Sequence, residues 1–238
     1  MIIETYPFAT AVNEEDLTGK SVVVIDVLRA TSVMITALEN GAKEIIPVIT
    51  VKGALQVAKK FKPDSYLLCG ERNAVKIDGF DFGNSPLEFS REVVAGKTLI
   101  MTTTNGTKAL NACRKAKEVY IAGFLNANAV VKKIRDKSEI VLLCSGTNGK
   151  FSLDDGLCAG MIMDKLSENG HAVTDDLGHI LLKTWQSSKG SLDQTLKNCY
   201  HLNVLVENGF EKDVDYCLQK NTHLIVPVYK PDKGNIHV

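Results

Sequence analysis

Acidic and basic side chains follow two apolar runs of the sequence, and their types suit the binding of a phosphate and a hard cation. Asp26 and Arg29 come after the run 22–25, and Glu71 and Arg72 follow a second run. Mg²⁺ is usually bound by one or two carboxylates together with water and substrate oxygens. Arginine can hold a phosphate or sulfonate through two parallel hydrogen bonds. These residues predict a site for a small anion and a metal ion, although an Asp26–Arg29 salt bridge would also explain that pair.

Hydroxyl and amide side chains follow other runs and could complete such a site. Thr104 and Asn105 lie in the threonine-rich segment Thr102–Thr107, whose hydroxyl and backbone N–H groups could cradle an anion. The segment lacks the G-x-x-x-x-G-K-[ST] pattern of a P-loop, and threonine and asparagine are also common in plain turns. Asn84 and Ser85 precede a predicted helix start, where backbone N–H groups favour an anion. Alternatively, Ser85 serves only as the helix cap.

A serine and a pair of acids follow the last of these runs. Ser145 comes directly after Glu139–Cys144, and Asp154 and Asp155 open a predicted helix. Two acids in the first turn of a helix can simply complement its dipole. Alternatively, one of them binds the metal ion while the other caps the helix. The sequence leaves both interpretations open.

The histidines and cysteines give no sign of a zinc site or a redox motif. The histidines show no H-E-x-x-H or other paired spacing; they are His171, His179, His201, His223 and His237. The six cysteines form no C-x-x-C pair, and we expect them to be buried, reduced thiols.

Apolar runs alternate with segments of helical period through the first 150 residues. The expected strands are Val22–Asp26, Glu44–Ile49, Tyr66–Gly70, Thr98–Thr102, Glu118–Ala122 and Glu139–Cys144. The expected helices are Thr31–Asn40, Lys52–Phe61, Pro86–Val94, Thr107–Lys115 and Ala127–Asp136. Such alternation predicts an α/β fold with a largely parallel sheet. In such sheets ligands bind beyond the carboxyl ends of the strands, which is where the candidate residues lie.

The chain after Asp154 is rich in predicted helices. The expected elements there are the helices Leu157–Glu168, Asp175–Ser187, Leu192–Val206 and Lys212–Leu218 and a last strand, His223–Val228. Because no long linker or low-complexity segment interrupts the chain, we expect one compact unit over residues 1–238. A weak subdivision near residue 150 is the alternative. The apolar helices of this part also suggest a homodimer.

The sequence contains a faint internal repeat. Residues 24–31 lead through a predicted helix to Ala42-Lys43-Glu44, and residues 100–107 lead through another to Ala116-Lys117-Glu118. Each copy has a strand, a polar turn, a helix and then Ala-Lys-Glu before the next strand. A duplicated unit and chance similarity between α/β segments explain this pattern about equally well.

Charge and hydropathy argue against nucleic acids and membranes as partners. Lys plus Arg and Asp plus Glu both number 28, so no basic surface for an extended polyanion is expected. No apolar run approaches the ~18–20 residues that span a bilayer. The N-terminal segment, Met1–Thr10, lacks the basic and apolar regions of a secretory signal. We therefore expect a cytoplasmic location.

The candidate segments also occur together in a distinctive order. They are Asp26–Thr31, Gly70-Glu71-Arg72, Gly79–Pro86, Thr103–Thr107, Cys144-Ser145-Gly146 and Asp154-Asp155. In this order the chain resembles the 2-phosphosulfolactate phosphatase family over most of its length. The resemblance implies a three-layer α/β/α fold with a mixed, largely parallel sheet. It also implies a magnesium-dependent hydrolase that converts 2-phosphosulfolactate to sulfolactate and phosphate, a step of coenzyme M biosynthesis.

Residue types and resemblance together suggest a role for each candidate. The expected metal ligands are Asp26, Glu71 and Asp155. The expected catalytic residues are Asp26, Arg29, which would stabilise the phosphoryl group, and Asp81, which would position or deprotonate the attacking water. The expected substrate-binding residues are Arg72, Asn84, Ser85, Thr104, Asn105 and Ser145. We favour direct attack by water over an aspartyl-phosphate on Asp26, because the D-x-D pattern of aspartate-based phosphatases is missing.

Two other classes of protein remain as alternatives. One is an α/β hydrolase with Cys144 as its nucleophile, which would need no metal ion. The other is a non-catalytic module that binds small organic anions, which would release no phosphate. Nucleotide binding is disfavoured because its glycine fingerprint is absent.

Overall fold

The computed structural model describes residues 1–168 and 173–238, so His171 lies outside the described residues. The strands are β1 (Ile2–Tyr6), β2 (Ser21–Ile25), β3 (Glu44–Pro47), β4 (Tyr66–Arg72), β5 (Val75–Lys76), β6 (Thr98–Thr102), β7 (Glu118–Ala122), β8 (Glu139–Cys144), β9 (Val173–Thr174), β10 (Val228–Lys230) and β11 (Asn235–His237). The α-helices are α1 (Ala30–Glu39), α2 (Val51–Ala58), α3 (Arg91–Val94), α4 (Gly106–Ala112), α5 (Ala127–Ile134), α6 (Leu153–Ser167), α7 (Asp176–Ser188), α8 (Leu192–Leu196), α9 (Tyr200–Glu207) and α10 (Glu211–Cys217). Short 3₁₀ turns are η1 (Ala9–Ala11), η2 (Glu14–Leu17), η3 (Pro86–Glu88) and η4 (Phe124–Asn126).

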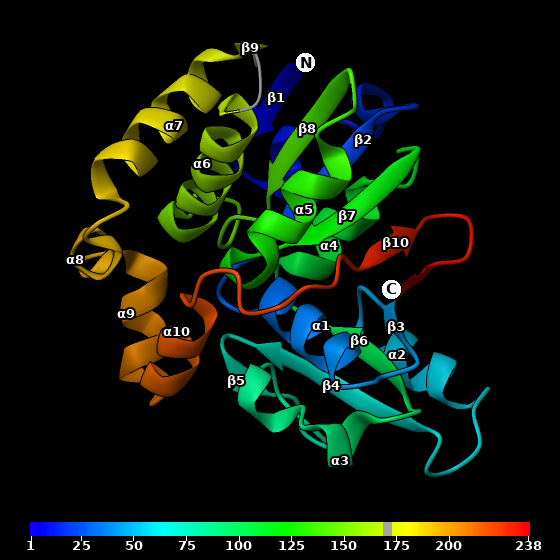
Figure 1. The fold of residues 1–238 in the computed structure, drawn as a ribbon. Helices are drawn as coiled ribbons and strands as arrows, with labels where there is room; N and C mark the ends of the chain where they lie inside the picture. The colour runs from blue at the N-terminus through cyan, green and yellow to red at the C-terminus, as the bar shows by residue number, and fades with distance from the viewer. Residues whose placement is uncertain (169–172) are drawn as a thin grey trace.

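The strands form one mixed sheet in the order β5-β4-β6-β3-β11-β10-β7-β2-β8-β1-β9. Strands β4, β6 and β3 make one parallel half, and β7, β2, β8, β1 and β9 make the other. The hairpin β10–β11 pairs antiparallel with β7 on one side and with β3 on the other. In Figure 1 this hairpin is the red segment between the green β7 and the blue β3. The expected mixed, largely parallel sheet is confirmed, and the last strands of the sequence lie in its middle.

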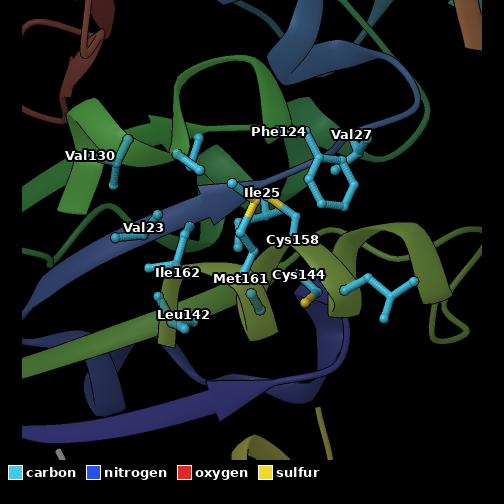
Figure 2. Packing of buried hydrophobic residues seen from close by; sticks show 14 of the residues in the cluster. Val23, Ile25, Val27, Phe124, Val130, Leu142, Cys144, Cys158, Met161 and Ile162 are labelled. Carbon is cyan, nitrogen blue, oxygen red and sulfur yellow. The ribbon is translucent and has the colours of Figure 1, made fainter. Parts of the chain in front are cut away.

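Helices cover both faces of the sheet, as β2 shows most clearly. Successive side chains of a strand point to opposite faces. Val23 and Ile25 pack with residues of β8, α5 and α6 in one core, shown in Figure 2. Val22 and Val24 belong to a second core that includes side chains of α1, α4 and both halves of the sheet. Helix α2 packs on the opposite face of β4 and β6. This is the expected α/β/α layering.

The faint repeat corresponds to two crossed units, β2–α1–β3 and β6–α4–β7. Each unit starts in one half of the sheet and ends in the other, because β2 pairs with β7 and β3 pairs with β6. The first strand of each unit thus pairs with the second strand of the other. This reciprocal pairing is what two-fold symmetry between the units would produce. Ser21 Oγ donates a hydrogen bond to Glu118 (3.1 Å), and at the equivalent position Thr98 Oγ1 donates to Glu44 (3.2 Å).

The loops that connect strand and helix also match between the units. Thr31 Oγ1 donates to the carbonyl of Asp26 (2.8 Å), and Thr107 Oγ1 donates to the carbonyl of Thr103 (2.9 Å). In both loops the backbone N–H of the first residue donates back to the same hydroxyl. These matches favour a duplicated unit over chance similarity, and they make Asp26 and Thr103 structural counterparts.

Two predicted helices are broken in the structure. The segment 86–94 consists of η3 and α3, because Phe89 leaves the helical region (φ −99°, ψ 54°) and buries its ring in the second core. The segment 192–206 consists of α8 and α9, separated by an extended Cys199. The predicted last strand begins only at Val228, and β1, β5, β9 and β11 were not predicted. No helix in residues 1–168 or 173–238 is both long and apolar enough to cross a lipid bilayer.

Candidate active site

A cavity of about 160 Å³ lies where the segments that follow four strands meet. Its lining includes Asp26 after β2, Glu71 near the end of β4, Thr104 after β6 and Thr147 after β8. An engineered cavity of ~150 Å³ holds one benzene molecule, so this volume suits a small ligand. The expected gathering of strand ends therefore occurs, and it joins loops from both halves of the sheet.

A second cavity, of about 510 Å³, adjoins the first. Both are lined by the same pair of segments, Thr147-Asn148 and Tyr200-His201. Residues 147–150 form a tight turn in which Asn148 and Gly149 adopt positive φ. The backbone N–H of Asn148 donates to Asn105 Oδ1 (3.1 Å), so Asn105 joins this turn to the loop after β6.

Asp26 presents a buried carboxylate to the first cavity. Its Oδ1 accepts a hydrogen bond from the backbone N–H of Ala30 (3.1 Å), whereas its Oδ2 accepts none from the described part of the chain. Burial raises the pKa of Asp26 to about 6, helped by repulsion from Asp154 and Glu71, while His201 opposes the shift. A carboxylate held in this way has an oxygen available for a cation or a reacting group.

Asp154 is the acid of this region that most lacks partners. Its side chain is 1% exposed, and neither carboxylate oxygen has a hydrogen-bond partner among the described residues. Its pKa is raised by burial, and the nearby His201 counteracts this shift, with His201 Nδ1 3.9 Å from Asp154 Oδ2. Two unpaired oxygens in a buried carboxylate are costly unless an ion or water binds them.

The neighbouring Asp155 uses both of its oxygens to hold the backbone. Oδ1 accepts from the N–H of Val27 (2.8 Å), and Oδ2 accepts from the N–H of Gly146 (3.0 Å). Burial and the charges of Asp154 and Asp26 raise the pKa of Asp155 well above its usual value. Asp155 lines neither cavity; its two hydrogen bonds join the loop after β2 to the loop after β8.

Glu71 lines the first cavity and also braces its wall. Oε1 accepts from the N–H of Thr104 (2.6 Å), and Oε2 accepts from the hydroxyl of Thr104 (3.1 Å) and the N–H of Ala74 (3.0 Å). The hydrogen-bonding capacity of Glu71 is therefore largely used within the protein. Thr104 lies on the cavity lining with its hydroxyl turned to Glu71.

Arg29 also lines the first cavity, and its ion pair is with Asp213 rather than Asp26. Its Nη1 donates to Asp213, and its Nη2 donates to the carbonyl of Ala74 (3.2 Å). The ring of Phe210 lies against the guanidinium, 3.9 Å from ring centroid to Cζ. Arg29 and Asp213 are both buried.

Asn84, Ser85 and Ser145 are buried polar residues with different surroundings. Asn84 lines the first cavity, and its Oδ1 has no hydrogen-bond partner in the described structure. Ser85 does not cap the following turn with its side chain; its hydroxyl donates to Asp213 (2.6 Å) instead. Ser145 lines neither cavity, and its hydroxyl is unpaired among the described residues.

Arg72 and Asp81 lie outside both cavity linings. The guanidinium of Arg72 donates to the backbone and hydroxyl of Thr102 and to the carbonyls of Glu71 and Ile49, so it connects loops of the sheet. The exposed Asp81 accepts from the N–H of Leu68 (2.8 Å). The structure does not bring these two side chains together with the other candidates.

Cys144 lies in the hydrophobic core beside Cys158, as Figure 2 shows, and its thiol is fully buried. Burial raises the pKa of Cys144 well above that of a free thiol. A thiol so buried, with a raised pKa, is a poor nucleophile, which argues against the cysteine-hydrolase alternative. Within residues 1–168 and 173–238, no three His, Cys, Asp or Glu side chains are close enough to hold a metal ion by themselves.

The sequence patterns missed the contribution of α9 and α10. Tyr200, His201 and Val204 of α9 line the first cavity, and Phe210 and Asp213 surround the Arg29 guanidinium. These residues follow no strand and have no metal-ligand spacing, so no local signal joins them to the strand ends. His201, to which the sequence patterns assigned no role, borders both cavities.

Comparisons with known proteins place this chain in a family. A profile of the family described as 2-phosphosulpholactate phosphatase matches residues 7–232. A protein of Clostridium perfringens (strain SM101 / Type A) named probable 2-phosphosulfolactate phosphatase is 47% identical over 239 residues, covering 99% of this chain and 96% of its own. Proteins of the same name from Caldanaerobacter subterraneus subsp. tengcongensis and Clostridium novyi are 46% and 41% identical, covering 97% and 96% of this chain and 96% and 97% of their own. This chain therefore belongs to the 2-phosphosulfolactate phosphatase family.

Proposed function

We propose that this protein is a magnesium-dependent phosphatase that hydrolyses 2-phosphosulfolactate, or a closely related small anionic phosphate monoester, to the hydroxy acid and phosphate. Family membership and the names of the relatives support the reaction class. The small cavity among polar loops supports a compact substrate. The observation that carries the proposal is the pair of buried acids, Asp26 and Asp154, which line the first and the second of two adjoining cavities, respectively.

The charges around the cavity support a role for a cation in this function. Asp26 and Glu71 line the cavity, and Arg29, whose charge Asp213 already balances, is its only permanent cation in the described structure. A substrate with phosphate, carboxylate and sulfonate groups would be repelled by such a site. A divalent cation would reverse the local charge and supply the missing attraction.

Asp154 and Asp26 are the residues that fit a magnesium ion best. Asp154 has two orphaned buried oxygens, and Asp26 has one oxygen without a protein partner. The oxygens of Asp155 are engaged by backbone N–H groups, so we now favour Asp154 over Asp155 as a ligand. Glu71 would act mainly through water. Two carboxylates with water and substrate oxygens are a usual magnesium set, so such a site needs no three-ligand cluster, and residues 1–168 and 173–238 contain none.

The protein side chains have defined tasks in this proposal. Bound Mg²⁺ would polarise a phosphoryl oxygen and offset the charge of the transition state. Arg29 donates hydrogen bonds to the phosphoryl oxygens from a fixed orientation. Asn84, with unused hydrogen-bonding capacity on the cavity wall, contacts the same group or the carboxylate. The second cavity gives the rest of the substrate room beside His201. Water attacks the phosphorus directly.

The decisive experiment is phosphate release from racemic 2-phosphosulfolactate by metal-stripped protein, with and without Mg²⁺. We expect release only with Mg²⁺. The same assay with 2-phospholactate and phosphoglycolate tests whether the sulfonate is required. No release from any of the three substrates in the presence of Mg²⁺ would contradict the proposal and leave the anion-binding module as the better explanation.

A cytoplasmic location and a homodimer are also proposed. The six cysteines are all free, which is typical of a reducing compartment. Ile180 and Leu224 are large apolar side chains exposed in the C-terminal part, and a second subunit could cover them. Light scattering on the purified protein would test the dimer, and fractionation of the host cell would test the location.

A further inference from the structure

We propose that Asp213 is a positioning residue for Arg29, so that α10 belongs to the active site although no residue of α10 lines a cavity. This inference rests on the proposed function, because it assigns Arg29 to the phosphoryl group. It begins with the hydrogen-bonding capacity of Arg29. A guanidinium has five N–H donors, and only two kinds of contact within the described structure use them, one to Asp213 and one to Ala74. Donors therefore remain for a ligand in the cavity.

Asp213 binds this guanidinium through one of its two carboxylate oxygens. One carboxylate oxygen accepts from Arg29, and the other accepts from Ser85 Oγ (2.6 Å). Asp213 is thus fixed by a hydroxyl from the segment before η3 while it binds the arginine. The ring of Phe210, one turn earlier, lies 3.9 Å from ring centroid to Arg29 Cζ, within the range of a cation–π contact. The guanidinium of Arg29 is therefore held by three contacts, with Asp213, the carbonyl of Ala74 and the ring of Phe210.

Stability alone is a weak explanation for this arrangement. The desolvation of a buried ion pair commonly cancels the attraction within it, so such pairs add little to folding. Their attested contribution is a unique arrangement of side chains. A phosphate-binding arginine benefits from that, because donors already aligned with the transition state need no reorganisation during the reaction. We therefore assign Asp213 to catalysis through Arg29 rather than to stability.

A double-mutant cycle tests the assignment. The variants are Arg29→Gln, Asp213→Asn and the double variant, each assayed for kcat and KM and for binding of inorganic phosphate by calorimetry with Mg²⁺ present. Arg29→Gln should lower kcat/KM by about 100-fold, and Asp213→Asn should lower it by about 10-fold, mainly through kcat. The double variant should match Arg29→Gln alone, because Asp213 has no target once the guanidinium is gone.

Matched variants separate positioning from folding. Asp215→Asn removes an exposed carboxylate from the same helix and should leave kcat/KM unchanged. Asp213→Glu keeps the buried charge, so it avoids an unpaired Arg29, but its longer side chain displaces the guanidinium and should still lower kcat. This second variant decides the matter if Asp213→Asn does not fold. Full activity in a folded Asp213→Glu or Asp213→Asn protein would overturn the assignment.

The cycle also distinguishes this inference from the proposed function. Suppose that the wild-type protein releases phosphate and that the fold-losses of kcat/KM in the two single variants multiply in the double variant. The proposed function is then supported, and the positioning role of Asp213 is wrong. If the wild-type protein releases no phosphate, the reaction is wrong and the calorimetric cycle decides the role of Asp213. Non-additive losses of phosphate affinity would then support it. Absence of phosphate binding in that case would contradict it, because Arg29 would not be an anion contact.

Discussion

Ala30 and Gly106, the first residues of α1 and α4, lie in contact beside the carboxylate of Asp26. A Cβ on Gly106 would be 2.6 Å from Ala30 Cβ and 2.9 Å from Asp26 Oδ2. Real Cβ atoms do not approach other atoms so closely. The two helices of the repeat therefore begin as near to each other as a glycine allows, and this closeness brings the loop after β6 over Asp26.

Gly106→Ala should therefore impair the site. The new methyl group has to displace Ala30 or the Asp26 carboxylate, and overpacking of this kind costs ~1–3 kcal/mol. We expect a lower melting temperature and a loss of kcat that exceeds any change in KM. Gly190→Ala is the matched control, because nothing lies within 4 Å of its Cβ position and its φ is not positive. Wild-type kinetics in Gly106→Ala would show that the contact does not constrain Asp26.

Asp26→Asn should lower kcat by about 100-fold or more, since it removes the charge that would bind the metal ion. The folded state should be at least as stable as the wild type at neutral pH, because a buried charge is replaced by a neutral group of the same shape. Asp81→Asn is the comparison: this exposed side chain accepts a hydrogen bond from Leu68 and should leave kcat almost unchanged. A larger loss of kcat in Asp81→Asn than in Asp26→Asn would instead support a catalytic role for Asp81.

The adjacent acids should give opposite phenotypes. Asp154→Asn should weaken Mg²⁺ binding, measured as the Mg²⁺ concentration for half-maximal activity, while the protein stays folded. Asp155→Ala should mainly reduce stability, because it strands the buried N–H groups of Val27 and Gly146 at ~1–3 kcal/mol each. Urea unfolding of both variants measures this difference. Equal loss of Mg²⁺ affinity in both variants would contradict the assignment of Asp154 as the ligand.

Mg²⁺ should stabilise the protein more as the pH rises. Burial raises the pKa of Asp26 from 3.8 to about 6, so the folded state holds this proton more tightly than the unfolded state. Without metal, the contribution of Asp26 is complete below the unfolded pKa and is lost as the pH rises through about 6. Mg²⁺ binds the ionised carboxylate, so its stabilising effect grows over the same interval.

Thermal unfolding at about pH 5 and about pH 7, with and without Mg²⁺, measures this linkage. Asp26→Asn is the reference, because its side chain has no proton to lose at this position. Without metal, its melting temperature should depend less on pH than that of the wild type. The same pH dependence in the variant and the wild type would mean that Asp26 does not titrate in this range.

Strand positions explain how much of the site could be predicted. Asp26, Glu71, Thr104 and Asn105 line the first cavity, and they were predicted because polar residues at the ends of apolar runs gather where loops meet. Asn84 lines it too, and it was predicted from its place before a helix start. Convergence was expected because the strands were predicted to form a mixed, largely parallel sheet. The structure reaches it differently, by crossing β2–α1–β3 with β6–α4–β7, so loops of two separate parallel halves share the cavity.

The direction of individual side chains was harder to predict, although one case had a usable signal. Glu71 and Arg72 are neighbours on β4, and consecutive strand residues point to opposite faces. Only one of them could face the cavity. Asp154 and Asp155 differ by ~100° around α6, but nothing local shows which of them meets the backbone of Val27. Asp213 reaches Arg29 across 184 positions, a contact that no local pattern reveals.

The place of β10–β11 in the middle of the sheet has a consequence for protein synthesis. A ribosome makes both parallel halves before it makes the hairpin that joins them. Until then β7 and β3 each expose an unpaired edge, the kind of surface on which nascent chains associate wrongly. Phe210 and Asp213, which surround Arg29, are also translated late. The active site therefore cannot be complete before residues 210–237 have been translated, even if both parallel halves have already folded.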